Sequence, residues 1–357
     1  MSYETANYLP KEVSVRQAAE FAILLGYRRS GTYAHLGSPS TISLIHFEPK
    51  DYRSWHAVEL SISSSANGVV VGTRTRVGRS HYDFQFQNRT VREFRKRFGG
   101  KTLRDGGNGT GYDPGPPLPP PASGCYLAMQ RLDWNLSRIN QYLMGEPNKS
   151  LHDESLEKLS KIFPVVKELT SQTFSCNVLL PYLVAMMEDY LKSTYIAVLS
   201  YSERKPAIFK GSRLSGESLA KISNGHTTVE EAVAESMSFQ NLAAVGKHFQ
   251  EIDPKLDILA VLRKPHGRGK RTLLEKMEIL VSQRHELIHG MNIDRSLDHA
   301  KVRVLVRDLT LAMSRIYLYL GDHFGWSYEL PVSTNFLLRA PSRQRPFLAQ
   351  KKAHADN

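Results

Sequence analysis

The chain has 357 residues, of which 41% are hydrophobic and 23% are charged. This composition is typical of a soluble globular protein, and the length favours two domains of about 150 residues each. Lys and Arg outnumber Asp and Glu by 47 to 35, which gives a formal net charge of +12. A positive charge of this size favours a polyanionic partner such as a nucleic acid.

Membrane proteins and disulfide-rich secreted proteins are disfavoured. The most apolar run, residues 178–199, is interrupted by one proline and three charged residues, so it predicts a core helix and not a membrane span. Cys125 and Cys176 are too few for a disulfide framework or a cysteine-based zinc site. The N-terminus shows no signal-peptide pattern. We therefore expect a cytoplasmic protein with no membrane partner.

Residues 1–110 mix helical and strand patterns. The stretch 14–29, SVRQAAEFAILLGYRR, has helical spacing, and Asn67-Gly68 is a hairpin signal between two runs rich in β-branched residues. The stretch 90–101, TVREFRKRFGGK, predicts a helix with Thr90 as its N-cap and Gly99 at its end. Together these patterns predict an α+β accessory or sensor domain, mostly an antiparallel sheet with flanking helices. The strand-like runs are TISLIHFE (41–48), WHAVELSI (55–62), VVVGTRTRV (69–77) and YDFQFQ (82–87).

The rest of the chain follows a proline-rich stretch. Residues 111–124, GYDPGPPLPPPASG, predict a stiff and extended linker, because repeated prolines cannot continue a helix or a central strand. Residues 125–330 read as an all-α domain, and residues 331–357 as a flexible tail. Thr272 and Glu275 form a capping box that opens one of the helices. The predicted helical segments are 126–143, 153–171, 177–200, 229–250, 272–289 and 297–322.

The segment RHELIHG, residues 284–290, has two incompatible interpretations. From His285 it is H-E-x-x-H, the zinc-binding helix of a metalloprotease, with Glu286 as general base. From Arg284 it is an arginine followed five residues later by His289, a pair suited to phosphodiester cleavage without a metal. The zinc interpretation needs a third ligand, and the residues that should continue its extended pattern, glycine and histidine, are replaced by Asn and Arg.

A helical wheel separates these two interpretations. At about 100° per residue, most apolar residues of 273–288 fall within about 80° of Arg284, namely Leu273, Leu274, Met277, Leu280, Val281, Leu287 and Ile288. The guanidinium of Arg284 therefore lies near the centre of an apolar stripe, where a charge is costly unless it is paired. A site that binds phosphate gives a reason for such an arginine, whereas a zinc helix does not.

The helical part of the chain resembles the HEPN superfamily of small α-helical bundles, many of which are metal-independent ribonucleases. The resemblance extends from Asn177 to Gly325. LLPYLVAMMEDYLKSTYIAVL is similar to the family's first long helix, with Glu188 at its acidic position, and SFQNLAAVGKHF to its middle helices. LEKMEILVSQRHELIHG resembles the active-site helix, although His285 stands where Asn is common, and VRVLVRDLTLAMSRIYLYL resembles the closing helix.

The resemblance implies Arg284 and His289 as the catalytic pair, with His285 and Glu188 as supporting residues. It implies an endoribonuclease without cofactor or metal, which cleaves RNA by attack of the 2′-OH to give 2′,3′-cyclic phosphate and 5′-OH ends. It also implies a homodimer, and a toxin or antiviral-defence effector that a regulatory protein or a phage-derived trigger controls. The alternatives are a catalytically inactive dimerisation or adaptor protein and, less favoured, the zinc metalloprotease.

Two groups of basic residues are candidates for RNA contact. The first lies in the loop before the helix that carries Arg284, and the second in the helix that follows residue 90. Each group is also compatible with an ordinary solvated surface. The residues are Arg263, Lys264, Arg268, Lys270 and Arg271 in the loop, and Arg92, Arg95, Lys96 and Arg97 in the helix.

Overall fold

The computed structural model describes residues 2–29, 41–105, 107–108, 111–145, 151–265, 270–327 and 329. The chain divides into two compact units: unit 1 comprises residues 1–127, 196–207 and 325–327, and unit 2 comprises residues 128–195, 208–324 and 328–357. An N-terminal antiparallel sheet with helices is followed by a helical region, which confirms the predicted order of fold classes. The predicted tail, 331–357, lies outside the described residues.

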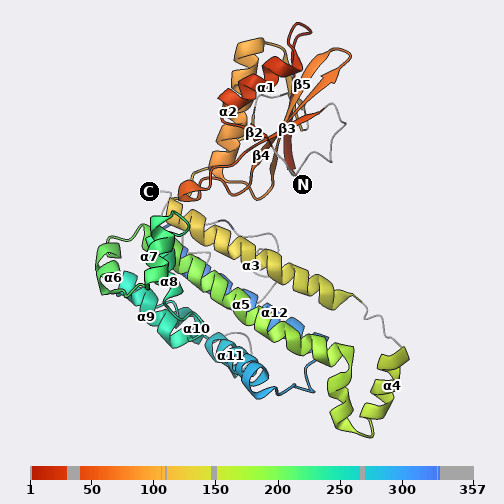
Figure 1. Cartoon of the computed structure of the whole chain (residues 1–357), viewed down its shortest axis with the longest axis vertical. Helices are drawn as coiled ribbons and strands as arrows, with labels where there is room; N and C mark the ends of the chain where they lie inside the picture. Colours follow the sequence, from red (N-terminus) through yellow and green to blue (C-terminus); the bar gives the residue numbers. More distant parts are fainter. Residues whose placement is uncertain are drawn as a thin grey trace, which may run out of the picture. The chain divides into compact units, whose positions relative to one another are not determined.

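Unit 1 is built on a seven-stranded antiparallel sheet with the strand order β2-β3-β4-β5-β1-β6-β7 (Figure 1). The N-terminal strand β1 therefore lies inside the sheet, between β5 and β6, although no sequence pattern predicted it. The β4–β5 hairpin turns at Asn67-Gly68, as predicted. The strands are β1 (Ser2–Tyr8), β2 (Arg28–Arg29), β3 (Ile42–His46), β4 (Val58–Ser65), β5 (Gly68–Arg76), β6 (Lys101–Arg104) and β7 (Gly107–Asn108).

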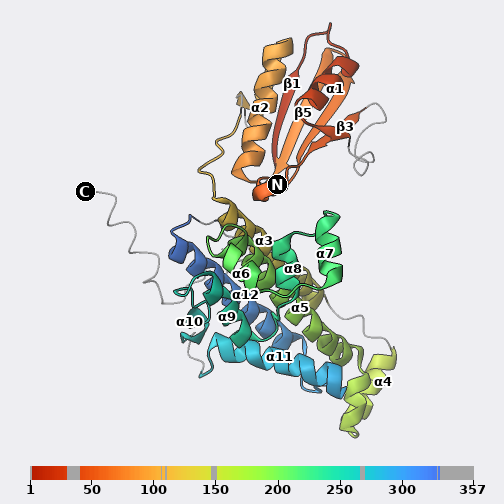
Figure 2. The ribbon, with the colours of Figure 1, turned by 60° about the vertical axis from the view of Figure 1, so that its left-hand side comes forward.

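Helices α1 (Val15–Leu24) and α2 (His81–Phe98) pack on one face of this sheet (Figure 2). Apolar side chains from both helices and from the central strands form a single buried core. A 3-10 turn, η1 (Lys50–Tyr52), precedes β4. The side chains at the centre of this core include Ala18, Ala22, Leu60, Ile62, Val71 and Phe94.

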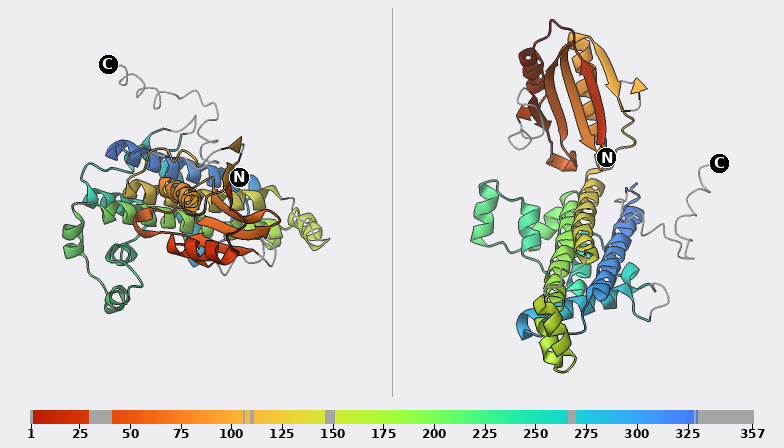
Figure 3. Two further views of the ribbon diagram at one scale, coloured as in Figure 1. Left: turned by 90° about the horizontal axis from the view of Figure 1, so that it is seen from above. Right: turned by 90° about the vertical axis from the view of Figure 1, so that its right-hand side faces the viewer.

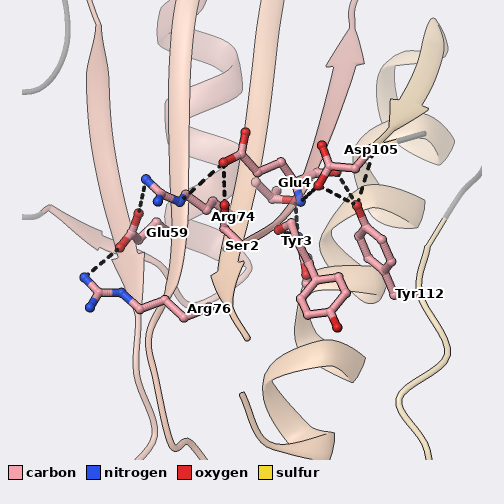
Figure 4. Close-up of polar contacts among 10 residues, drawn as sticks. Ser2, Tyr3, Glu4, Glu59, Arg74, Arg76, Asp105 and Tyr112 are labelled. Atoms are coloured by element: carbon pink, nitrogen blue, oxygen red, sulfur yellow. Dashed lines mark hydrogen bonds and ion pairs between the residues drawn. The ribbon is translucent and has the colours of Figure 1, made fainter. Parts of the chain in front are cut away.

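The opposite face of the sheet carries small and charged residues. Ser61 and Gly72 stand opposite each other on β4 and β5, and the next row contains Glu59, Arg74 and Glu4. Figure 4 shows this charged row, in which Arg74 Nε lies 3.4 Å from a Glu4 carboxylate oxygen and Arg74 Nη1 lies 4.0 Å from a Glu59 oxygen. These residues border a shallow groove of about 590 Å³. None of the site residues predicted from the sequence lies on this face.

Helix α2 corrects two predictions. Residues 82–87 do not form a strand, and Thr90 is not an N-cap, because the helix already begins at His81. The Ser80 hydroxyl accepts a hydrogen bond from the Asp83 N–H at 2.9 Å, and the Asp83 carboxylate accepts one from the Ser80 N–H at 2.9 Å. This reciprocal cap starts the helix ten residues before the expected position. The end of the helix at Gly99, with φ 75°, agrees with the prediction.

The first part of the proline-rich segment, residues 111–119, forms neither helix nor strand. Helix α3 (Pro120–Met144) begins inside the predicted linker. The N–H groups of a first helical turn have no partner within the helix, so proline, which has no N–H, is compatible with that position. Tyr112, in the preceding residues, is hydrogen-bonded to α2 and to strand β1. The Tyr112 N–H donates to Asn88 at 2.8 Å, the Tyr112 hydroxyl donates to the carbonyl of Glu4 at 2.6 Å, and Asn88 donates to the Tyr112 carbonyl at 2.7 Å.

The C-terminal region contains long helices that run side by side (Figure 3). The described part of α5 is apolar on most of its surface, and the Tyr190 hydroxyl donates to the carbonyl of Met313 in α12 at 3.1 Å. Arg131 of α3 pairs with Asp189 of α5 at 2.7 Å. The elements after α3 are α4 (Leu151–Ser160), η2 (Pro164–Leu169), α5 (Ser171–Ser200), α6 (Lys205–Gly211), α7 (Gly216–Ser223), α8 (Val229–Glu235), α9 (Leu242–Ile252), α10 (Ala260–Arg263), α11 (Leu273–Gly290) and α12 (His299–Phe324).

Two of the helices predicted for this region are wrong. Residues 153–171 do not form one helix, because α4 ends at Ser160 and a 3-10 turn begins at Pro164, whose ring cannot donate to a helical ladder. Residues 229–250 divide into α8 and α9, because the side chain of Asn241 accepts from the Ala244 N–H at 3.1 Å and starts a new helix. The sequence patterns also did not predict α6, α7 and α10.

Candidate functional site

Helix α11 positions Arg284. The predicted capping box is present at the start of the helix, where Thr272 and Glu275 satisfy each other's backbone N–H groups. Leu273, Met277 and Leu280 are fully buried at helical spacing, and Arg284 follows on the same side one turn later. Its side chain is half-buried. A guanidinium in this position needs a partner, because burial without one is costly.

Glu188 of α5 is an acidic side chain whose carboxyl pKa responds to the charge of Arg284. Its side chain is half-buried. Burial raises the pKa of the Glu188 carboxyl, whereas a hydrogen bond with the Gln240 side chain and the positive charge of Arg284 both lower it. The carboxylate therefore lies within reach of side chains from two other segments. The structure thus brings together Glu188 and Arg284, two of the four residues that the family resemblance implied.

His285 and His289 form a second pair on the exposed side of α11. Their ring centroids lie 4.4 Å apart, with the rings tilted by 45°. Neither histidine forms a hydrogen bond with Arg284 in the described part of the chain. The helix extends one residue beyond the predicted end at 289, to Gly290, and its C-cap Met291 takes the left-handed conformation with φ 51°. His289 is consequently a residue of the last helical turn, one position before Gly290.

A zinc site built on H-E-x-x-H finds no third ligand among the described residues. No group of three or more His, Cys, Asp or Glu side chains is placed there to hold a metal ion. Glu286, the general base of that interpretation, accepts a hydrogen bond from Ser282 at 3.3 Å on the outer side of the helix. The two histidines alone supply only half of the four ligands that zinc usually takes.

The basic residues fall into the two groups named from the sequence. In the loop before α11, Lys270 and Arg271 are exposed, whereas Arg263 pairs with Asp257 at 3.3 Å. The carbonyl of Lys264 accepts a hydrogen bond from Arg315 at 3.1 Å. Arg268 lies outside the described residues. The second group belongs to α2 of unit 1, and all of its side chains are exposed, namely Arg92, Arg95, Lys96 and Arg97.

Gln240 is a neighbour of Glu188 that the sequence patterns did not predict. It lies in the connection between α8 and α9, half-buried, and forms the hydrogen bond with Glu188. No local pattern marks a single glutamine in a loop. Only the adjacent Asn241, an N-cap residue, signals that the chain changes direction at this point.

Comparisons with protein families, with curated proteins and with solved structures find no match for this chain. Within the described residues, every helix is too short or too polar to cross a bilayer. The function must therefore be argued from the arrangement of the side chains themselves.

Proposed function

We propose that the helical region is a HEPN-like bundle and that the protein is a metal-independent endoribonuclease. The observation that carries the proposal is the half-buried Arg284, whose charge acts on Glu188 and which stands directly before His285 and five residues before His289 in the same helix. A guanidinium near a carboxylate, with two histidines in the same helix, suits a reaction at a phosphodiester. The net charge of +12 is in keeping with a polyanionic substrate.

In this proposal the RNA supplies its own nucleophile. A base removes the proton of the 2′-OH, the oxygen attacks the adjacent phosphorus, and the bond to the 5′ oxygen breaks as that oxygen takes up a proton. His289 is the proton carrier, because imidazole exchanges protons near neutral pH. Arg284 binds the phosphate oxygens through its planar fork, and Glu188 orients that fork. His285 is the second proton carrier or a further phosphate ligand.

The proposal includes a homodimer that places two such sites together. Helix α5 exposes an apolar stripe formed by Phe174, Val178 and Tyr182, whose exposed fractions are 56%, 40% and 59%. These residues recur every four positions and therefore share one side of the helix. Exposed apolar patches of this kind commonly mark protein–protein interfaces. Glu188 lies within about 80° of Val178 on the helical wheel, so a second copy bound to the stripe would lie beside the site.

The test is incubation of the purified protein with RNA, with and without EDTA, beside Arg284→Ala and His289→Ala. Arg131→Ala, an exposed arginine of α3, is the matched control. We expect cleavage that survives EDTA, is lost in the two site variants and leaves 2′,3′-cyclic phosphate ends. Activity that chelation abolishes, together with stoichiometric zinc, would establish the metalloprotein alternative. Absence of cleavage under every trigger tested would favour the adaptor.

A further inference from the structure

Helix α3 carries two exposed aromatic side chains on one side. Trp134 and Tyr142 are 62% and 52% exposed, and Arg138, also exposed, lies between them. The three residues recur every four positions, so they form a row along about 12 Å of the helix, which we call the α3 stripe. Tryptophan is highly buried on average in folded proteins. A tryptophan that leaves most of its ring in water therefore indicates a surface that a ligand covers.

The charged groups that belong to the α3 stripe are guanidinium groups. The Arg138 guanidinium carbon lies 5.5 Å from the centre of the Trp134 ring, and Arg138 forms no ion pair with a carboxylate of the described segments. At the other end, the Tyr142 ring lies 6.1 Å from the ring of His299, the first residue of α12. Arg303 of α12 is exposed and donates to the carbonyl of Leu143 at 3.2 Å, which uses one of its five N–H groups. A polyanion bound along the stripe would thus meet one guanidinium in the middle and another beside Tyr142.

The carboxylates around the α3 stripe are engaged elsewhere. Helix α3 lies against α5 and α12 (Figure 3), and Asp189 of α5 pairs with Arg131 at 2.7 Å, so we exclude Arg131 from the stripe. Asp298, directly before α12, accepts a hydrogen bond from the Lys301 N–H at 2.8 Å. Asp133 lies on the other side of α3, about 140° around the helix from the middle of the stripe. The electrostatic character of the stripe is therefore set by its arginines.

The mixture of aromatic rings and guanidinium groups favours a nucleic acid over a protein partner. The exposed stripe of α5, formed by Phe174, Val178 and Tyr182, has no charged residue among its members, as expected of a protein interface. The α3 stripe instead alternates ring, guanidinium and ring. Unpaired bases stack on aromatic rings while the phosphates contact arginine, and this combination is typical of surfaces that bind single strands. Bases inside a duplex are already stacked on one another and cannot make these contacts.

We propose that the α3 stripe, together with Arg303, binds single-stranded RNA. Bases stack on Trp134 and Tyr142, and Arg138 contacts the phosphate between them. The site differs from both groups of basic residues that the sequence indicated. That the bound RNA is a substrate rests on the proposed function, whereas the binding itself is independent of cleavage.

The experiment measures binding of a fluorescently labelled oligo-adenosine of about 16 nucleotides by fluorescence anisotropy. Every 2′ oxygen of this probe is methylated, so the probe has no 2′-OH to attack the phosphorus, and binding is measured apart from cleavage. Trp134→Leu and Tyr142→Leu should each raise the Kd by about 5-fold to 100-fold, because each removes one stacking ring. Phe163→Leu, at a residue of η2 that is 58% exposed, is the matched control and should leave the Kd unchanged.

Arg138→Gln tests the phosphate contact. This variant should weaken binding and reduce the slope of log Kd against log salt concentration by about 0.7, because one phosphate contact is lost. Trp134→Leu should leave that slope unchanged, since stacking releases no counterion. Arg213→Gln, at an exposed arginine between α6 and α7, removes the same charge elsewhere and should change neither the Kd nor the slope.

Two results would overturn the site. The first is a wild type that does not bind the probe, or that binds it with the same Kd as Trp134→Leu and Tyr142→Leu. The second is a change of oligomeric state in these variants, measured by light scattering, with unchanged RNA binding, which would make the stripe a subunit interface. A wild type that binds the probe through the stripe but cleaves no RNA would support the site and contradict the proposed function alone.

Discussion

Replacing Asp308 with asparagine should destabilise the helical region strongly. Asp308 of α12 is 3% exposed, and its carboxylate lies 2.9 Å from Lys276 Nζ of α11. Its other oxygen lies 3.2 Å from the guanidinium of Arg307, which is mostly exposed. The pair between Lys276 and Asp308 links α11, the helix that carries Arg284, to α12. Asparagine has nearly the same shape as aspartate but leaves the ammonium of Lys276 without a counter-charge.

The geometry sets the size of the effect. At an effective dielectric constant near 20, unit charges separated by 2.9 Å attract each other by about 6 kcal/mol. Desolvation of both groups offsets part of this attraction, and the Lys276 side chain, 25% exposed, regains some hydration when the pair is broken. We therefore expect Asp308→Asn to lower the free energy of unfolding by about 2–4 kcal/mol. For a unit of this size the melting temperature should fall by roughly 4–16 °C.

The assay is urea and thermal denaturation followed by circular dichroism, with Asp189→Asn as control. Asp189 makes an equally short pair with Arg131, at 2.7 Å, but the two side chains are about half exposed. This control should lose less than about 1 kcal/mol. Adding Lys276→Met to Asp308→Asn removes the unpaired ammonium and should restore part of the stability. Equal losses in Asp308→Asn and Asp189→Asn would refute the argument from burial.

Three further predictions concern single residues. Burial raises the pKa of Glu188 in the folded state, so the wild type loses stability as the pH rises from the unfolded pKa through the folded one. The melting temperature of Glu188→Gln should therefore exceed that of wild type at pH 7 and equal it at about pH 4. A variant that has a lower melting temperature than wild type at pH 7 would contradict this expectation. Asp83→Ala leaves the backbone N–H groups of residues 55, 56 and 80 without their acceptor. It should lower the free energy of unfolding, measured by urea denaturation, by roughly 3 kcal/mol. Tyr182→Glu should convert a dimer into a monomer in size-exclusion chromatography with light scattering, whereas Leu219→Glu, at an exposed residue of α7, should not.

Local signals predicted those elements of the fold whose cause is local. The Asn67-Gly68 hairpin and the Thr272–Glu275 capping box depend on residues that are neighbours in sequence, and both are present. The alternation of aromatic and polar residues in YDFQFQ wrongly predicted a strand. Ser80 and Asp83 cap a helix at this point, and the cap sets the backbone conformation of the residues that follow. Aspartate in place of the usual glutamate made that capping box inconspicuous.

The N-terminal strand was missed because its partners are distant in sequence. Strand β1 pairs with β5 and β6, and its inward side chains are polar instead of apolar. Thr5 is buried against the Thr73 hydroxyl, and Asn7 donates to the carbonyl of Val91 in α2 at 3.2 Å. Such a strand lacks the apolar alternation on which strand prediction depends. Its stability comes from hydrogen bonds that only the folded chain supplies.

The same distinction explains which parts of the candidate site could be foreseen. Helical periodicity alone places Arg284 beside buried leucines, and the cost of burying a guanidinium implies that some partner exists. Periodicity cannot identify the residues near it, because Glu188 belongs to another helix and comes near Arg284 only through tertiary packing. Glu188 was proposed from a family resemblance, and Gln240 was not proposed at all. A charged residue within the apolar stripe of a helix therefore predicts where a candidate site lies. The side chains that surround this residue must be found from the fold.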